Sequence, residues 1–91
     1  MSRQALKCTV EGHVQGVFYR VRTLERATEL GIDGWVRNLN NGCVELVVCG
    51  DDDAVERLIA WLWKGPPNAQ VSAVAVEDWQ GNIDAGFQIV D

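Results

Sequence analysis

A short stretch near the N-terminus carries residue types suited to binding a phosphate or a carboxylate. The run from Gly12 to Arg20 (Gly-His-Val-Gln-Gly-Val-Phe-Tyr-Arg) follows a strand pattern and enters a helical pattern near Phe18. A turn with two glycines at this point can direct several backbone N–H groups inward, at the positive end of the new helix. Arg20 falls in the first helical turn, so its guanidinium can reach over the same hollow. N–H donors together with an Arg fork predict an anion site.

Hydrophobic periodicity predicts the elements that would position these groups. Strand patterns cover residues 4–11, 34–39, 43–50, 71–79 and 87–90, and a helical pattern covers residues 18–30. A second helix is expected between an N-cap at residues 51–53 and a stop at Gly65. In the first strand, one face holds Leu6, Cys8 and Val10. In the first helix, the spacing predicts a buried stripe of Val17, Val21, Leu24 and Thr28.

The order of these elements, β-α-β-β-α-β and a short fifth strand, predicts an α+β fold with a single domain over residues 1–91. Two helices would cover one face of a mainly antiparallel sheet, in the split β-α-β arrangement. Right-handed crossovers place the third strand between the first two, which then run parallel. The glycine loop and the Asn-Asn-Gly hairpin of residues 40–42 therefore fall at one edge of the sheet. Asn38 has the parity of Val36, so its side chain is expected on the helix side, toward the loop.

The groups expected at this edge favour one kind of phosphoryl chemistry. Loop N–H groups and Arg20 can hold a phosphoryl group, and the amide of Asn38 can hold a water. No carboxylate or thiol belongs to the set, because Glu11 faces the other side of the sheet by parity. A phosphomonoester needs its alkoxide leaving group protonated or stabilised by a metal ion. A carboxyl phosphate releases a carboxylate, whose conjugate acid has a pKa of roughly 4, and it needs only charge stabilisation and an aligned water.

Two motifs of the chain resemble those of the acylphosphatases. One is Gly12-x-Val14-Gln15-Gly16-Val17-x-Tyr19-Arg20, and the other is Gly34-Trp35-Val36-Arg37-Asn38 followed by the Asn-Gly turn. The resemblance continues to Leu62 and covers essentially the whole domain. It implies a ferredoxin-like two-layer sandwich with five strands, and an enzyme that hydrolyses acyl phosphates to a carboxylate and phosphate without a cofactor or metal.

By position, the resemblance also implies a role for each motif residue. Arg20 would bind the phosphoryl group together with loop N–H groups, and Asn38 would orient the attacking water. Tyr19 stands where family members usually have Phe, and its aromatic role is expected to persist. A small acyl phosphate is the implied substrate, and inorganic phosphate is expected as product and competitive inhibitor. The implied phosphate-binding loop comprises Gly12, His13, Val14, Gln15, Gly16 and Val17.

Composition limits the other classes of function. A net charge of −5 argues against a nucleic-acid binder, and no apolar stretch is long enough to cross a bilayer. We therefore expect a cytoplasmic monomer without nucleic-acid or membrane partners. Cys8, Cys43 and Cys49 show no metal-binding spacing, so no metal site is predicted. If Glu11 lies opposite Cys43, Ala5 falls near Cys49, and all three thiols are expected to be free.

Two alternatives stay open on the sequence alone. The same fold could capture a phosphorylated ligand without chemistry, although Asn38 has no clear duty in simple anion binding. The chain could also be an acylphosphatase-like domain of a larger enzyme, but its start at Met1 and its own last strand lead us to expect a separate protein. His13 is expected to be an exposed loop side chain without a catalytic role. Trp61 and Trp63 are expected to cover the margin of the core.

Overall fold

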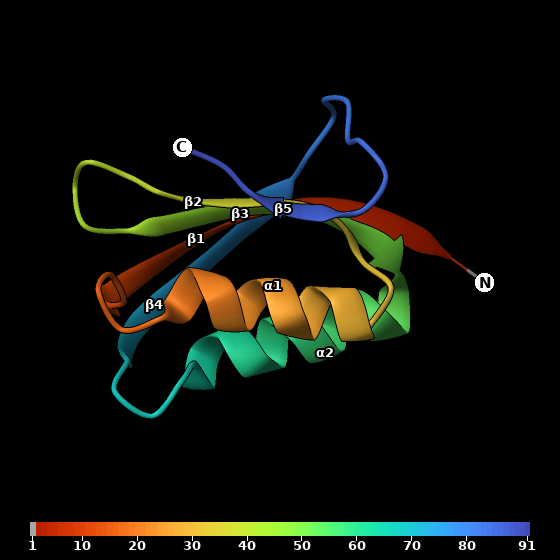
Figure 1. The fold of residues 1–91 in the computed structure, drawn as a ribbon. Coiled ribbons are helices and arrows are strands. Elements are labelled where there is room, and N and C mark those ends of the chain that lie inside the picture. Colours follow the sequence, from red (N-terminus) through yellow and green to blue (C-terminus); the bar gives the residue numbers. More distant parts are fainter. Residues whose placement is uncertain (1) are drawn as a thin grey trace.

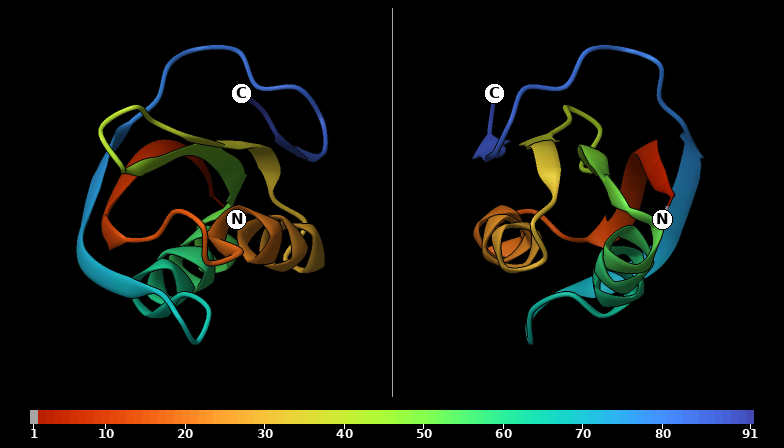
Figure 2. Two further views of the ribbon diagram at one scale, coloured as in Figure 1. Left: turned by 60° about the vertical axis from the view of Figure 1, so that its left-hand side comes forward. Right: turned by 90° about the vertical axis from the view of Figure 1, so that its right-hand side faces the viewer.

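The computed structural model describes residues 2–91 and has the predicted α+β architecture. Helices α1 and α2 lie side by side against one face of a five-stranded sheet (Figure 1). Figure 2 shows the same two layers from two further directions. The elements, in chain order, are β1 (Arg3–His13), α1 (Tyr19–Glu29), β2 (Asp33–Asn38), β3 (Val44–Asp51), α2 (Asp52–Lys64), β4 (Gln70–Asp78) and β5 (Phe87–Ile89).

The strand order β4-β1-β3-β2-β5 places β3 between β1 and β2, as the crossover rule predicts. Strand β3 pairs antiparallel with both neighbours, so β1 and β2 run parallel and end at the same edge. The register is also the predicted one, because Ala5 pairs with Cys49. The loop after β1 and the β2–β3 hairpin consequently project from the same end of the molecule, at the left of Figure 1.

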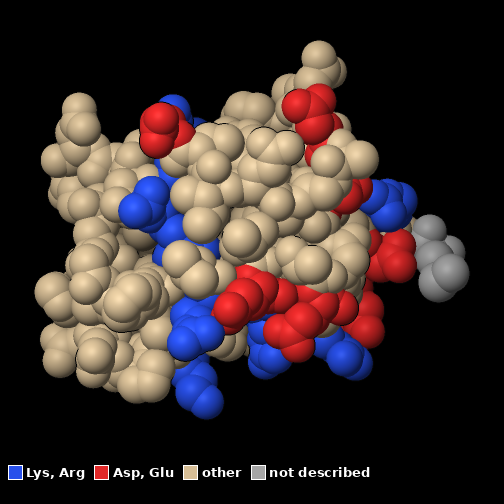
Figure 3. Space-filling model, in the orientation of Figure 1, with Lys and Arg blue, Asp and Glu red and all other residues tan. Residues whose placement is uncertain are grey.

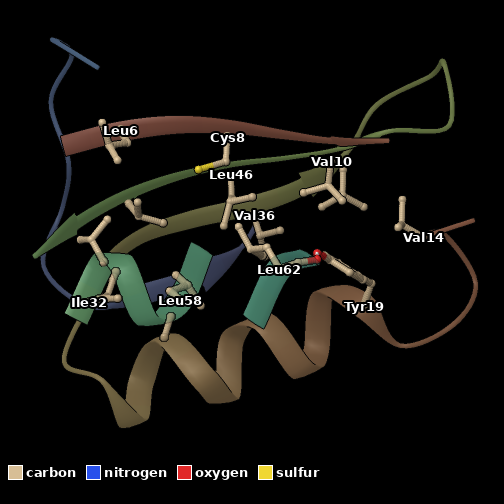
Figure 4. Packing of buried hydrophobic residues seen from close by; sticks show 14 of the residues in the cluster. Leu6, Cys8, Val10, Val14, Tyr19, Ile32, Val36, Leu46, Leu58 and Leu62 are labelled. Carbon is tan, nitrogen blue, oxygen red and sulfur yellow. The ribbon is translucent and has the colours of Figure 1, made fainter. Parts of the chain in front are cut away.

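The core lies between the helices and the sheet. Leu6, Cys8 and Val10 point from β1 toward the helices and are buried, as their alternation predicts (Figure 4). All three cysteines are free thiols, and Cys8 is completely buried. Burial raises the pKa of the Cys8 thiol to about 11, because the thiolate is poorly solvated there.

The buried stripe of α1 differs from the one that the spacing predicts. Tyr19, Thr23 and Ala27 face the core, whereas Val21 is 43% exposed, so the predicted stripe is wrong along the helix itself. Positions two residues apart on a helix point roughly 200° apart, so burial of Tyr19 turns Val21 outward. Of the predicted stripe, Val17 is buried in the loop before the helix, while Leu24 is half-buried and Thr28 exposed.

Tyr19 determines which face of α1 is buried, because its hydroxyl has a partner in the core. It donates a 2.6 Å hydrogen bond to the carbonyl oxygen of Leu62, near the end of α2 (Figure 4). The residue that would donate to this carbonyl in a continuing helix is Pro66, which has no N–H. The phenol of Tyr19 therefore caps a carbonyl that the helix leaves without a donor. Burial also raises the pKa of Tyr19, which keeps the hydroxyl neutral.

The two tryptophans of α2 differ in environment. Trp61 is half-buried against the core, with its ring centroid 5.6 Å from that of Tyr19, as predicted for a residue at the core margin. Trp63 is 52% exposed, and the prediction that it covers the core is wrong. Asp51 is the N-cap of α2, but its side chain makes no capping hydrogen bond, so the acidic first turn acts through charge alone.

Candidate active site

The loop between β1 and α1 is shorter at its start than the sequence predicts. Strand β1 continues through Gly12 and His13, which pair with Val71 and Gln70 of β4 after a bulge. Gly12 has a φ of 131°, and a Cβ there would lie 2.0 Å from the carbonyl oxygen of Gln70. The glycine is thus required by the close approach of β4. Gly12 and His13 belong to the strand, and the loop proper consists of residues 14–18.

The backbone of this loop carries hydrogen-bond donors that the rest of the described chain does not use. Across residues 2–91, no backbone carbonyl accepts from the N–H groups of residues 14–18. Gly16 and Phe18 adopt left-handed conformations, with φ of 76° and 64°, just before the N-terminus of α1. Successive N–H groups in such turns, at the positive end of a helix, form concave anion sites.

A pocket of about 250 Å³ opens beside the loop and joins three elements. It lies between the loop, the first turn of α1 and the end of β2, so Arg20 and Asn38 share it, as the strand order predicts. This volume is below the ~300–1,000 Å³ typical of pockets for drug-sized ligands, which suits a small anion with a short substituent. Four of the predicted site residues do not line it: Gly12, His13, Gln15 and Val17. The lining residues are Val14, Gly16, Phe18, Tyr19, Arg20, Val21 and Asn38.

Arg20 and Asn38 have no protein partner among the described residues, whereas the hydroxyl of Tyr19 is paired with the carbonyl of Leu62. Within the described part of the chain, Arg20 forms no ion pair, although six ion pairs join other residues. The Oδ1 atom of Asn38 is buried and accepts no hydrogen bond. Buried polar atoms in proteins are almost always paired, so an unpaired oxygen beside an unpaired guanidinium indicates a ligand site.

The charge distribution favours an anion at this end of the molecule. On the face shown in Figure 3, Asp and Glu gather over the helices and near the N-terminal end of the sheet. Lys and Arg are spread more widely over this face, along its lower edge, beside the N-terminus and toward the end where the loop and the hairpin project. The one charged side chain that lines the pocket itself is the guanidinium of Arg20. A net charge of −5 therefore coexists with a locally basic pocket.

Gln15 connects the loop to the hairpin through its side chain, a role that the sequence analysis misses. Its Nε2 atom donates a 2.8 Å hydrogen bond to the carbonyl oxygen of Leu39 and a 2.9 Å hydrogen bond to that of Cys43. Leu39 directly follows Asn38, so Gln15 holds the hairpin and the loop in register. No periodicity reveals this contact, because it depends on the exact distance between two loops in the folded chain.

The described residues offer neither a metal site nor a membrane span. No group of three or more His, Cys, Asp or Glu side chains between residues 2 and 91 is arranged to hold a metal ion. Neither described helix is long and apolar enough to cross a membrane.

Comparisons with known proteins converge on one family. The sequence model of the family described as Acylphosphatase matches residues 6–89. A relative from Pelotomaculum thermopropionicum, named acylphosphatase, is 47% identical over 91 residues, which cover 98% of each chain. The solved structure of an acylphosphatase from Coxiella burnetii has a TM-score of 0.92 and 43% identity, covering 97% of this chain and 93% of that one. The acylphosphatase of Bacillus subtilis has a TM-score of 0.91 at 26% identity, covering 99% and 100%.

Proposed function

This chain belongs to the acylphosphatase family, and on that premise we propose how its pocket hydrolyses an acyl phosphate to a carboxylate and inorganic phosphate. The N–H groups of residues 14–18 and the guanidinium of Arg20 bind the phosphoryl group. The amide of Asn38 holds the water that attacks phosphorus. The observation that supports this most is that Arg20 and the buried Oδ1 of Asn38 share one pocket and have no protein partner there.

Phosphoryl binding uses donors that are already in place before the substrate arrives. The loop N–H groups have no competing backbone acceptor, and they lie at the N-terminus of α1, where the helix dipole favours negative charge. Arg20 adds a fixed positive charge with a fork of donors that matches two phosphoryl oxygens. Donors that need no reorganisation stabilise charge as it develops, which lowers the barrier for transfer.

Water activation is assigned to Asn38. Its Oδ1 accepts a hydrogen bond from the water, which turns a lone pair of the water toward phosphorus. In a loose transition state the bond from phosphorus to the acyl oxygen is largely broken before the water adds, so positioning matters more than a strong base. The water oxygen forms the new P–O bond, the acyl P–O bond breaks, and the acyl oxygen leaves as a carboxylate. Both protons of the water remain with the phosphate, which is released as dihydrogen phosphate.

The leaving group makes a metal ion and a general acid unnecessary in this proposal. A carboxylate, whose conjugate acid has a pKa of roughly 4, departs at neutral pH without protonation. The side chains that line the pocket accordingly include the guanidinium of Arg20 and the carboxamide of Asn38, but no carboxyl or thiol group. Hydrolysis is expected to proceed at the same rate in the presence of EDTA.

Two substitutions separate binding from turnover. With benzoyl phosphate as a model substrate, Arg20→Ala should lose both hydrolysis and inhibition by inorganic phosphate. Asn38→Ala should retain phosphate inhibition but lose turnover by roughly 10²–10³-fold, as when one preorganised group is removed. Arg22→Ala is the matched control, because Arg22 is exposed on the same helix and does not line the pocket. Normal turnover in Asn38→Ala would refute the assigned role, and a wild-type protein that binds phosphate without hydrolysing acyl phosphates would be a binding module.

A further inference from the structure

We propose that Phe18 and Val21 bind the acyl group of the substrate, so that the enzyme prefers acyl phosphates with an apolar, above all an aromatic, acyl group. This inference rests on the function proposed above and assigns the other half of the substrate. The polar half of the pocket accounts for the phosphoryl group but leaves two exposed apolar side chains at the same site without a role.

Phe18 combines two features that give no benefit to folding. It is 74% exposed, the highest value among the exposed large hydrophobic residues of the described chain. It is also the one residue other than glycine with a positive φ, 64°, between residues 2 and 91. An aromatic side chain rarely adopts this left-handed conformation, and such strain is concentrated at functional sites. The conformation that turns the loop N–H groups inward thus also leaves an exposed aromatic ring at the pocket.

The ring lies beside the phosphoryl site. Phe18 is the N-cap residue of α1, between the free N–H groups of the loop and Arg20, and its carbonyl accepts a 3.1 Å hydrogen bond from the N–H of Arg22. Val21 follows three residues later, in the first turn of α1. Both residues line the pocket that contains Arg20 and Asn38.

Elimination leaves Phe18 and Val21 as the acyl contacts. An in-line displacement places the acyl oxygen opposite the attacking water, so the acyl group extends away from the Asn38 side. Among the other lining residues, Val14 and Tyr19 are each only 1% exposed, and Gly16 has no side chain. The exposed apolar surface that an acyl group meets at this pocket is therefore that of Phe18 and Val21.

The chemistry of the lining selects an apolar acyl group over a charged one. Arg20 is the one charged side chain that lines the pocket, and the phosphoryl group engages it. An acyl group with a carboxylate would find no second cation, and one with an ammonium would find no carboxylate. An aryl group can stack on Phe18 and displace water from Val21, which favours it over a methyl group.

Substrate discrimination tests this assignment. The ratio of kcat/KM for benzoyl phosphate to that for acetyl phosphate is measured in the wild type and in Phe18→Asn, Phe18→Leu and Val21→Ser. Asn tolerates the left-handed conformation, so Phe18→Asn removes the ring and keeps the backbone. Comparing this ratio between variants cancels the different intrinsic reactivity of the two substrates. Val76→Ser is the matched control for Val21→Ser, since Val76 is 44% exposed on β4 and does not line the pocket.

The expected result is a fall of roughly tenfold in the ratio for Phe18→Asn, the low end of the discrimination that one apolar contact provides. The ratio for Phe18→Leu should lie between those of the wild type and Phe18→Asn. The ratio for Val21→Ser should fall several-fold, and the ratio for Val76→Ser should match that of the wild type. Inhibition by inorganic phosphate, measured in parallel, reports whether the loop is intact. A proportional fall for both substrates with weakened phosphate inhibition would overturn the inference, because Phe18 would then only shape the loop.

Failure of this inference is distinguishable from failure of the proposed function. If the wild type hydrolyses both substrates, and neither Phe18→Asn nor Val21→Ser changes the ratio, the acyl contact is refuted and the hydrolytic function stands. If the wild type hydrolyses neither substrate, the proposed function is refuted, and the acyl contact with it.

Discussion

Replacing Gln15 with Met tests whether the loop and the hairpin must be held together for catalysis. Met has a similar length but donates no hydrogen bond, so the two bonds of 2.8 and 2.9 Å to the carbonyls of Leu39 and Cys43 are lost. Each carbonyl keeps a backbone donor, because Leu39 O also accepts from Gly42 N at 3.2 Å and Cys43 O from Leu39 N at 2.9 Å. No carbonyl is orphaned, and the cost is therefore the net value of two hydrogen bonds.

That net value sets the expected loss of stability. At about 0.5–1.5 kcal/mol per hydrogen bond, the free energy of unfolding should fall by about 1–3 kcal/mol. For a domain of this size, each kcal/mol lowers Tm by roughly 4–8 °C. Urea denaturation and a thermal melt of the same preparation give two independent readings of this loss.

Turnover should respond differently from phosphate binding. Without Gln15, the hairpin that carries Asn38 is free to shift against the loop that binds the phosphoryl group, and a misplacement of about 1 Å can cost about 100-fold in rate. We expect kcat to fall by more than tenfold, while the Ki of inorganic phosphate changes by less than about threefold. Gln88→Met is the control, because Gln88 is exposed on β5. Unchanged kcat, or equal effects on kcat and Ki, would refute a positioning role for Gln15.

Three further substitutions test the packing that supports the site. Tyr19→Phe removes the donor to the Leu62 carbonyl and should cost about 1–3 kcal/mol in urea denaturation; a loss below ~0.5 kcal/mol would contradict the capping role. Burial raises the pKa of Cys8 from 9.0 to about 11, so its stabilising contribution is complete below pH 9 and is lost as the pH rises through 11. Cys8→Ala should therefore flatten the pH profile of unfolding free energy by up to about 3 kcal/mol across this range, and parallel profiles would refute it. Gly12→Ala places a Cβ 2.0 Å from the Gln70 carbonyl oxygen and should destabilise the fold by more than ~3 kcal/mol; a mild effect, measured in the same way, would contradict the close approach of β4.

The arrangement of the three central strands could be predicted from the sequence, because local sequence patterns and the handedness of the crossover determine it. Alternation in β1, the Asn-Gly turn and the handedness of the crossover place β3 between β1 and β2 and fix the register of β1 with β3, whereas the positions of β4 and β5 are not predicted. The pairing of Ala5 with Cys49 follows from that register. The meeting of Arg20 and Asn38 in one pocket is a consequence of the same topology, so it could be predicted without any side-chain coordinates.

The features that could not be predicted depend on contacts between distant residues. The face of α1 that is buried follows from the hydrogen bond of Tyr19 to Leu62, and periodicity alone favours Val21. The brace formed by Gln15 depends on the distance between two loops. Gly12 reads as a turn residue in the sequence, but the structure requires it because β4 approaches closely. In each of these cases tertiary contact overrides a local pattern.

Hydrolysis of benzoyl phosphate by the wild-type enzyme in ¹⁸O-labelled water tests the central claim most directly. If the loop and Arg20 hold the phosphoryl group while Asn38 directs water at phosphorus, the label must appear in inorganic phosphate and the benzoate must stay unlabelled. Label in the benzoate would mean that water attacks the carbonyl carbon, and it would contradict the placement of both substrate and water in this pocket.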